Sequence, residues 1–223
     1  MNQGFASRTH RIVIVDDHPI VRAGLTALIG AEADLEVCGH AADPAEALRV
    51  VELSRPDLVL VDLSLGDASG LDLVKRLAER QLATLVVSVH KDPIWAERSL
   101  AAGARGYVHK GEASNDVVSA IRSVIAGRAW VSPSISVLLL GRRVGVPVRD
   151  QSAHPVELLS NRELEVFERI GQGLSTRQIG EALGLSRKTV QTHRERIKAK
   201  LLLGTAAELA AQAARWVSER ASG

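Results

Sequence analysis

The sequence predicts an α/β domain with a doubly wound parallel sheet, followed by an all-α domain of four helices. Short β-branched runs alternate with helical patterns over the first half of the chain, whereas only helical patterns follow residue 156. The charge divides in the same way. Residues 1–130 carry 14 Lys and Arg against 17 Asp and Glu, and residues 131–223 carry 14 against 9. An acidic first part joined to a basic second part indicates two domains, of which the second can bind a polyanion.

Five strands and five helices alternate in the first domain. The expected strands are Arg11–Asp16, Leu35–Ala41, Leu58–Asp62, Thr84–Val89 and Gly106–Lys110. The expected helices are His18–Gly30, Asp43 to about Leu53, Leu71–Arg80, Pro93–Ala102 and a fifth that Ser114 caps. Five such units favour a parallel sheet with helices on both faces, which binds ligands at the carboxyl ends of its strands.

Residues 129–155 are predicted to form a linker, because Pro133, Pro147 and Pro155 interrupt the pattern. One short apolar helix is expected within it, around Ile135–Leu140. Its apolar side chains fit equally well into a core or into an interdomain or dimer contact, and both interpretations stay open.

The second domain consists of helices with clear amino-terminal caps. Ser160, Ser175 and Ser186 precede the first three helices, and Ser160 with Glu163 matches a capping box. The predicted helices are Arg162–Ile170, Thr176–Leu183, one from Ser186 to about Leu201, and Ala206–Trp216. The second and third are joined by the short turn Gly184–Ser186, and the third is basic, which is typical of a helix-turn-helix.

The composition excludes several classes of protein. No apolar stretch of the 223 residues is long enough to span a bilayer, and residues 1–11 are too polar for a secretion signal. The single cysteine, Cys38, excludes an internal disulfide and cannot build a zinc site alone. We therefore expect a soluble, cytoplasmic protein with no membrane partner.

Three carboxylates are expected to converge at one edge of the sheet. Asp16 and Asp17 follow the first strand and Asp62 ends the third, and these strands are neighbours in the doubly wound order. Clustered carboxylates need a cation, for which Mg²⁺ and Lys110 are the candidates. A carboxylate beside Mg²⁺ can attack phosphorus, and Ser88 can donate to the phosphoryl group. Taken singly, Asp17 fits a helix cap better than a functional site, and Ser88 fits a turn better.

Taken together, Asp16-Asp17, Asp62, Ser88, Tyr107 and Lys110, with the segment Gly103–Lys110, resemble the receiver domain of bacterial two-component response regulators. The resemblance implies a flavodoxin-like (βα)5 fold with Asp62 as phosphoacceptor. It further implies that Asp17, Asp62 and the Ser64 carbonyl hold Mg²⁺ or Mn²⁺, with Asp16 acting through water. Ser88 and Lys110 would contact the phosphoryl oxygens. Tyr107 would be an aromatic switch, for which a plain core tyrosine is the alternative.

One loop departs from the receiver pattern. Many receivers have Met-Pro shortly after the acceptor, where this chain has Leu63–Gly70. Gly66 makes that loop more flexible, and the additional acid Asp67 is expected to change phosphorylation kinetics. A regulator that works without phosphorylation is therefore an alternative.

Three segments of the second domain, Leu159–Phe167, Gly173–Gly180 and Leu185–His193, resemble the helix-turn-helix of LuxR/FixJ (NarL-type) regulators. The resemblance implies a receiver at residues 9–128, the linker, and a DNA-binding domain at residues 156–221. It also implies a sensor histidine kinase as phosphodonor, double-stranded DNA as target and a homodimer after phosphorylation. RNA polymerase is a further candidate partner.

The third helix has a predicted buried stripe of Val190, Ile197 and Leu201, so its opposite face should enter the major groove. Gln191 can pair with adenine, Glu195 with cytosine, and Thr192 can contact a thymine methyl group. The residues assigned to phosphates are Arg187, Lys188, Arg194, Arg196, Lys198 and Lys200, and Thr189 completes the DNA-contacting set.

Two other classes of function were weighed against this hypothesis. A phosphohydrolase with an aspartyl-phosphate intermediate commonly needs a second Asp two residues after the nucleophile, and Ser64 occupies that position. A metabolite-gated quorum-sensing regulator would have a ligand-binding sandwich in place of five parallel β–α units.

Overall fold

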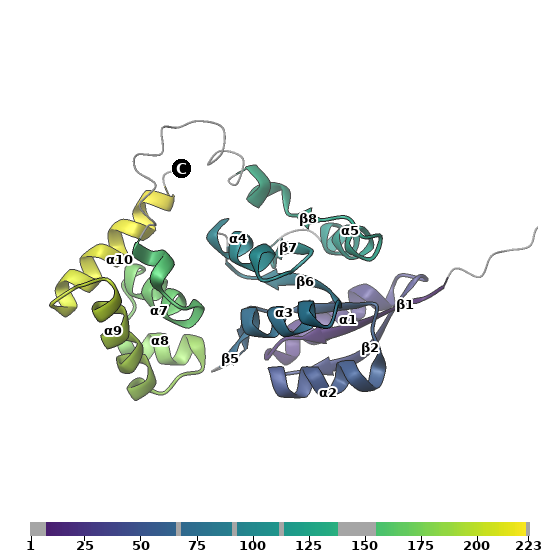
Figure 1. Ribbon diagram of the computed structural model, residues 1–223, viewed down its shortest axis with the longest axis horizontal. Coiled ribbons are helices and arrows are strands. Elements are labelled where there is room, and N and C mark those ends of the chain that lie inside the picture. The colour runs from purple at the N-terminus through teal and green to yellow at the C-terminus, as the bar shows by residue number, and fades with distance from the viewer. Residues whose placement is uncertain (1–7, 66–67, 91–92, 112–113, 138–154, 222–223) are drawn as a thin grey trace, which may run out of the picture. The chain divides into compact units, whose positions relative to one another are not determined.

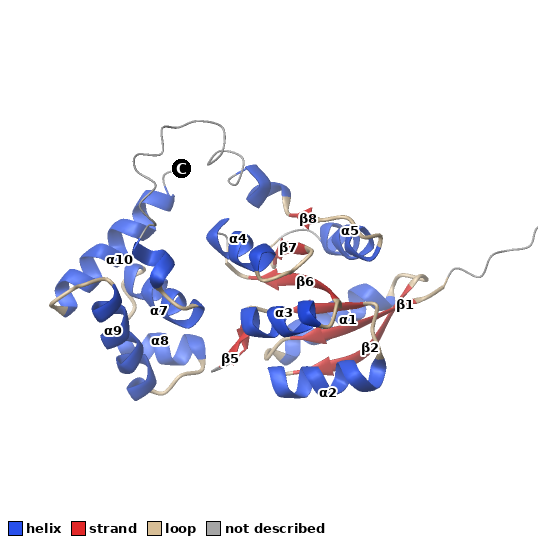
Figure 2. Ribbon diagram, in the orientation of Figure 1, coloured by secondary structure: helices blue, strands red, loops and turns tan. Residues whose placement is uncertain are grey.

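The protein is described by a computed structural model over residues 8–65, 68–90, 93–111, 114–137 and 155–221 (Figure 1). Contacts divide the chain into two compact units, residues 1–144 and residues 145–223. Within the described residues, all strands lie in the first unit, and the second consists of helices joined by short turns (Figure 2). The predicted order of an α/β domain before an all-α domain is therefore confirmed.

A parallel sheet of six strands forms the centre of the first unit, in the order β2-β1-β3-β6-β7-β8. Its strands are β1 (His10–Val15), β2 (Leu35–Ala41), β3 (Leu58–Val61), β6 (Ala83–Ser88), β7 (Gly106–His109) and β8 (Trp130–Val131). The helices between them are α1 (Pro19–Gly30), α2 (Pro44–Ser54), α3 (Gly70–Glu79), α4 (Pro93–Ala101) and α5 (Ser114–Ile125). The chain starts near one edge and reverses after β2, so a doubly wound sheet results.

Both faces of this sheet are buried, which explains why β3 and the last four residues of β1 are continuous apolar runs. On one face, side chains such as Ile12, Leu60 and Val108 form a core with Ile29 of α1 and Ile121 of α5. Helices α2, α3 and α4 contribute their own buried side chains to the unit. This packing fixes the carboxyl ends of β1, β3, β6 and β7 side by side.

The sheet is larger than the five strands that the sequence predicts. Trp130 and Val131, which we assigned to the linker, pair with Gly106 and Tyr107 as the sixth strand. A two-residue strand has too short a pattern to be predicted from its sequence. A second difference follows β3, where β4 (Ser64–Leu65) and β5 (Ala68–Ser69) form a small antiparallel pair in place of a plain loop.

The short helix expected around Ile135–Leu140 begins earlier. Residues 133–137 are helical, with Ile135 buried and Val137 69% exposed. Residues 138–140 lie outside the described part of the chain. The apolar side chains of this helix thus differ in their surroundings. Ile135 belongs to the core of the first unit, and Val137 faces away from that core.

The second unit comprises the 3₁₀ turn η1 (Pro155–Leu158) and helices α7 (Asn161–Gly171), α8 (Thr176–Leu183), α9 (Arg187–Lys200) and α10 (Ala206–Ala221). Ser160, Ser175 and Ser186 cap α7, α8 and α9 as predicted, and the first two complete capping boxes. Gly184 ends α8 in the left-handed conformation that favours glycine, which creates the turn into α9.

Helix α7 is the centre of this unit and contacts each of the other three helices. Phe167 of α7 meets Trp216 of α10 edge to face, with ring centroids 5.7 Å apart. Helix α9 packs on α7 and α8 through Val190 and Ile197. Within the described residues of the whole chain, no helix is long and apolar enough to cross a membrane.

Candidate functional site

The carboxyl ends of β1 and β3 bring three carboxylates together. Asp16 and Asp62 are almost completely buried and Asp17 is half-buried. One ligand atom from each of Asp16, Asp17, Asp62 and His18 lies within 4.8 Å of the others. The cluster forms because β1 and β3 are adjacent in register, with Val15 beside Val61.

Lys110, which follows β7, supplies the positive charge of the cluster. Its Nζ atom donates to Oδ2 of Asp16 and to Oδ2 of Asp62, both at 2.6 Å. Burial of the ammonium disfavours its charge, but the attraction and hydrogen bonds of the two carboxylates outweigh burial and raise the pKa of Lys110. The lysine is therefore held in its charged form.

For Asp62, the phosphoacceptor candidate, burial outweighs the attraction of the neighbouring charge. It raises the pKa of Asp62 to about 6, because the attraction of Lys110 offsets only part of the desolvation. The charge of Asp16 raises this pKa further, while the backbone N–H of Ser64 lowers it. The ionised carboxylate of Asp62 is thus held at high free energy, and one cation in the cluster does not balance three acids.

The cluster fits a hard divalent cation. Among the described residues, Lys110 binds the Oδ2 atom of Asp62 and no cation contacts the buried Oδ1 atom. Three clustered carboxylates with one ammonium repel each other, and a second cation relieves this repulsion. Mg²⁺ prefers carboxylate oxygens and keeps several waters. Because Asp17 is only half-buried, its side of the cluster is open to such waters.

The raised pKa of Asp62 predicts an effect on stability in metal-free buffer. A carboxyl group whose pKa is higher in the folded state destabilises the fold above that pKa, and this cost disappears as the pH falls toward the unfolded value. Asp62→Asn should therefore stabilise the first unit above pH 6, by an amount on the order of 3 kcal/mol. The gain should vanish near pH 4. Hydrogen exchange of the β1 and β3 amides in EDTA measures it, and an equal gain at both pH values would contradict the prediction.

Ser88 ends β6 and Tyr107 is the second residue of β7, and both are fully buried. The Tyr107 hydroxyl donates to the carbonyl oxygen of His90 at 2.6 Å, so the ring points inward. Ser88 Oγ accepts from the backbone N–H of His90 at 3.3 Å. The His90 ring stacks on Trp95 with centroids 4.4 Å apart. The segment after β6 is thus bound to both residues.

His18 belongs to the cluster, although the sequence analysis did not select it. Its Nδ1 atom lies 2.6 Å from Oδ1 of Asp17, and its backbone N–H donates to Asp16 at 2.8 Å. The position of His18 directly after two acids was the signal that could have found it. Its side chain is 61% exposed, in contrast to that of Asp16.

The loop after Asp62 is described only in part. Ser64, whose carbonyl was expected to bind the metal, lies in β4 opposite Ser69. Gly66 and Asp67, on which the expected kinetic difference depends, lie outside the described residues. Gly70 starts α3 directly against the end of β3, where its backbone N–H donates to the Leu63 carbonyl.

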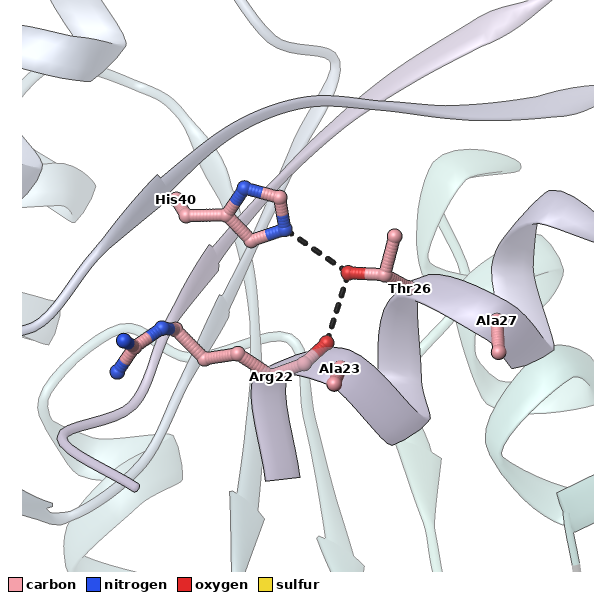
Figure 3. Close-up of a pocket in the computed structure, with 5 residues that line it drawn as sticks. All are labelled: Arg22, Ala23, Thr26, Ala27 and His40. Atoms are coloured by element: carbon pink, nitrogen blue, oxygen red, sulfur yellow. Dashed lines mark hydrogen bonds between the residues drawn. The ribbon is translucent and has the colours of Figure 1, made fainter. Parts of the chain in front are cut away.

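A shallow hollow lies apart from these residues, between α1 and β2 (Figure 3). Thr26 donates to the Arg22 carbonyl at 2.7 Å and meets Nε2 of His40 at 2.8 Å. Ala23 and Ala27 complete the lining. The hollow contains none of the site residues expected from the sequence.

Helix α9 has the expected phase. Val190, Ile197 and Leu201 are buried, so the side chains opposite them face away from the unit. The exposed residues on this helix include Arg187, Lys188, Gln191, Thr192, Glu195, Arg196 and Lys200, whereas Thr189, Arg194 and Lys198 are half-buried. The exposed set has the residue types that read bases and contact phosphates.

Several of these side chains are already bound to one another. Glu195 accepts from Gln191 at 2.9 Å and pairs with Lys198 at 2.8 Å, and the Lys198 hydrogen bond is the main reason that the pKa of Glu195 is lowered. Lys200 pairs at 2.6 Å with Glu163, which is buried at the start of α7. Lys200, which the sequence assigns to a DNA phosphate, is thus paired with a carboxylate of its own unit.

The two units match two different family models. Residues 12–122 match the response regulator receiver domain, and residues 157–213 match the bacterial regulatory proteins of the luxR family. The transcriptional regulatory protein UhpA of Salmonella typhimurium is 35% identical over 199 residues, covering 89% of this chain and 95% of UhpA. The chain is a NarL/FixJ-type response regulator.

Other relatives of this response regulator agree. The response regulator GacA of Pseudomonas viridiflava is 34% identical over 207 residues, covering 92% of this chain and 95% of GacA. The crystal structure of a two-component response regulator of the LuxR family from Aurantimonas sp. is 35% identical. It covers 61% of this chain and all but 1% of its own, with a TM-score of 0.60.

These matches decide between the classes of function. The response regulator combines a receiver with a LuxR-type DNA-binding domain and is a transcription regulator, not a phosphohydrolase. The parallel sheet and the match to the receiver domain also exclude the alternative of a ligand-binding sandwich in the first unit.

Proposed function

We propose that Asp62 accepts a phosphoryl group from a sensor histidine kinase, and that this transfer controls the binding of α9 to DNA. The observation that carries the proposal is the position of Asp62, a buried carboxylate that lies in one cluster with Asp16 and Asp17 and shares the ammonium of Lys110 with Asp16. The proposal keeps residues 9–128 as the phosphorylated domain and residues 156–221 as the DNA-binding domain. It places both in the cytoplasm.

In the proposed transfer, an oxygen of the Asp62 carboxylate attacks phosphorus while the bond from phosphorus to the histidine nitrogen of the kinase breaks. Asp17, Asp62 and the Ser64 carbonyl would hold Mg²⁺ or Mn²⁺, with Asp16 acting through water, and the cation would neutralise charge on the phosphoryl oxygens. Lys110 is near enough to Asp62 to exchange its contact with the carboxylate for one with the new phosphoryl oxygens.

Ser88 and Tyr107 would transmit phosphorylation of Asp62 to the segment after β6. A phosphoryl group on Asp62 gives the Ser88 hydroxyl proton a new acceptor, while the Ser88 oxygen at present accepts from the His90 N–H. Because Tyr107 binds the carbonyl of the same His90, a shift of that segment changes the environment of the tyrosine. Lys110 links the same strands, since its backbone N–H donates to the Ser88 carbonyl at 2.7 Å.

Phosphorylation is expected to promote dimerisation and to raise DNA affinity. A single helix-turn-helix buries little surface on DNA, and two half-sites related by two-fold symmetry are the usual remedy. Sedimentation and DNA titration with and without a beryllofluoride phosphoryl mimic test this together. If both are unchanged, the regulator acts without phosphorylation, which is the alternative raised by Gly66 and Asp67.

Within α9, we propose that Gln191, Thr192 and Glu195 read bases and that basic residues such as Lys188 contact phosphates. Gln191→Ala should therefore weaken binding mainly to a cognate duplex, by about 1–3 kcal/mol for a lost bidentate pair. Lys188→Ala should weaken all duplexes alike and reduce the slope of log K against log salt by about 0.9. Titrations of cognate and scrambled duplexes at several salt concentrations separate the two effects. Equal weakening of both duplexes by Gln191→Ala would mean that another face of α9 reads the groove.

A further inference from the structure

Two consecutive charged residues of α7, Arg162 and Glu163, are buried where charged side chains are uncommon. Each is buried because it binds an atom at the end of another helix. Glu163 contacts α9 and Arg162 contacts α8, and these are the two helices of the helix-turn-helix. Neither residue was selected for this purpose from the sequence.

Glu163 connects the start of α7 to the end of α9. Its Oε2 atom accepts from the Ser160 N–H at 2.7 Å and from Nζ of Lys200 at 2.6 Å. Burial raises the pKa of this carboxyl, but the hydrogen bonds of Lys200 and Ser160 outweigh burial, and the pKa lies below its usual value. The carboxylate is therefore charged at neutral pH, and Lys200 in the last turn of α9 neutralises it.

Arg162 connects the same turn of α7 to the end of α8. Its guanidinium donates to the Leu183 carbonyl at 2.5 Å and also pairs with Glu165 on α7. Leu183 is the last residue of α8, directly before the turn at Gly184 that leads into α9. The first turn of α7 thus binds two points of the helix-turn-helix. These are the end of α8, where the connection to α9 begins, and the last turn of α9.

We propose that Arg162 and Glu163 are positioning residues that fix the angle of α9 for DNA, and that Lys200 acts through Glu163 and does not contact a phosphate. Helix α9 is held at its carboxyl end by the pair of Lys200 with Glu163, and the turn before it is held at Leu183 by Arg162, so its outward side chains are presented in one orientation. To bind a phosphate, Lys200 would have to leave a buried carboxylate uncompensated, which is costly. The sequence assignment of Lys200 to a phosphate is revised accordingly.

The inference rests on the proposed role of α9, so the experiment includes a separate report on that role. Lys188 is the matched control, because it is an exposed lysine of the same helix that forms no ion pair with the described residues. Both lysines are changed to methionine, which keeps the aliphatic length. The DNA probes are a duplex selected from a random pool by the wild-type protein and a scrambled version of it.

Lys200→Met should leave the slope of log K against log salt unchanged and weaken the selected duplex about 10-fold more than the scrambled one. Lys188→Met should lower that slope by about 0.9 and weaken both duplexes alike. If Lys200→Met lowers the slope as Lys188→Met does, Lys200 is a phosphate contact and the inference is wrong. If neither change alters the slope, α9 does not face DNA and the proposed function of this helix fails.

Glu163→Gln supplies the second arm, because an amide keeps an oxygen for the Ser160 N–H while losing the charge that binds Lys200. In that background, Lys200→Met should cause less than about a 2-fold further change, since coupled residues are not additive. In the chain that keeps Glu163, Lys200→Arg should retain the discrimination between the duplexes that Lys200→Met loses. Far-UV circular dichroism at the assay temperature verifies that each variant is folded. Independent, additive effects of the two changes in folded variants would overturn the proposal.

Discussion

Asp62→Asn is expected to take up no phosphoryl group from a small phosphodonor such as acetyl phosphate with Mg²⁺, whereas the wild-type chain should take up one. The amide is a poor nucleophile at phosphorus and offers the metal no negative charge. Intact-mass spectrometry measures the uptake directly. The same measurement on wild-type protein in EDTA should also show no uptake, because the carboxylates would then repel the incoming phosphoryl group.

Asp72→Asn is the matched control for this experiment. Asp72 is an exposed carboxylate in the first turn of α3, ten residues after Asp62, and its variant should label like the wild type. Full labelling of Asp62→Asn would place the phosphoacceptor elsewhere. Loss of labelling in Asp72→Asn would show that the assay responds to changes outside the cluster.

Gly70→Ala is expected to destabilise the first unit and to disturb the phosphorylation site together. A methyl group at Gly70 would lie 2.1 Å from the Asp62 carbonyl oxygen and 2.6 Å from Cα of Leu63. Both are backbone atoms, so relief requires α3 to move away from the end of β3. Overpacking of this kind typically costs about 1–3 kcal/mol. Hydrogen exchange of the β3 amides and phosphoryl uptake should both show the effect.

Gly24→Ala is the control for the change of residue type itself. Gly24 lies in the middle of α1, and no atom is found within 4 Å of the position of an added methyl group. Alanine is the better helix former, so this variant should be more stable by about 0.5–1 kcal/mol. If Gly70→Ala were as well tolerated as Gly24→Ala, close packing of α3 on β3 would not matter for the site.

The sequence predicts the fold well where one residue pattern decides the structure. Fully buried strands such as Leu58–Val61 must be apolar on both faces, and capping serines such as Ser160 and Ser175 satisfy backbone groups within their own segment. The pair Trp130–Val131 has no such pattern. It becomes a strand only because β7 offers an unpaired edge beside it.

The candidate sites likewise contain contacts that the sequence predicts and contacts that it does not. The convergence of Asp16, Asp62 and Lys110 could be predicted, because the carboxyl ends of adjacent parallel strands meet at one edge. The pairing of Lys200 with Glu163 could not, since it joins residues 37 positions apart whose spacing depends on how α9 crosses α7. The bond between Tyr107 and the His90 carbonyl likewise depends on a backbone group, which leaves no trace in residue types.

The order of strands in the sheet has a consequence for synthesis of the chain. After β3, the strands β6, β7 and β8 are each added beside the previous strand of this sheet. Until Val131 has left the ribosome, the nascent sheet therefore ends on an unpaired strand, a surface that invites pairing with another chain. The two residues of β8 close that edge with a strand too short to template association. They do so before any part of the DNA-binding unit has left the ribosome.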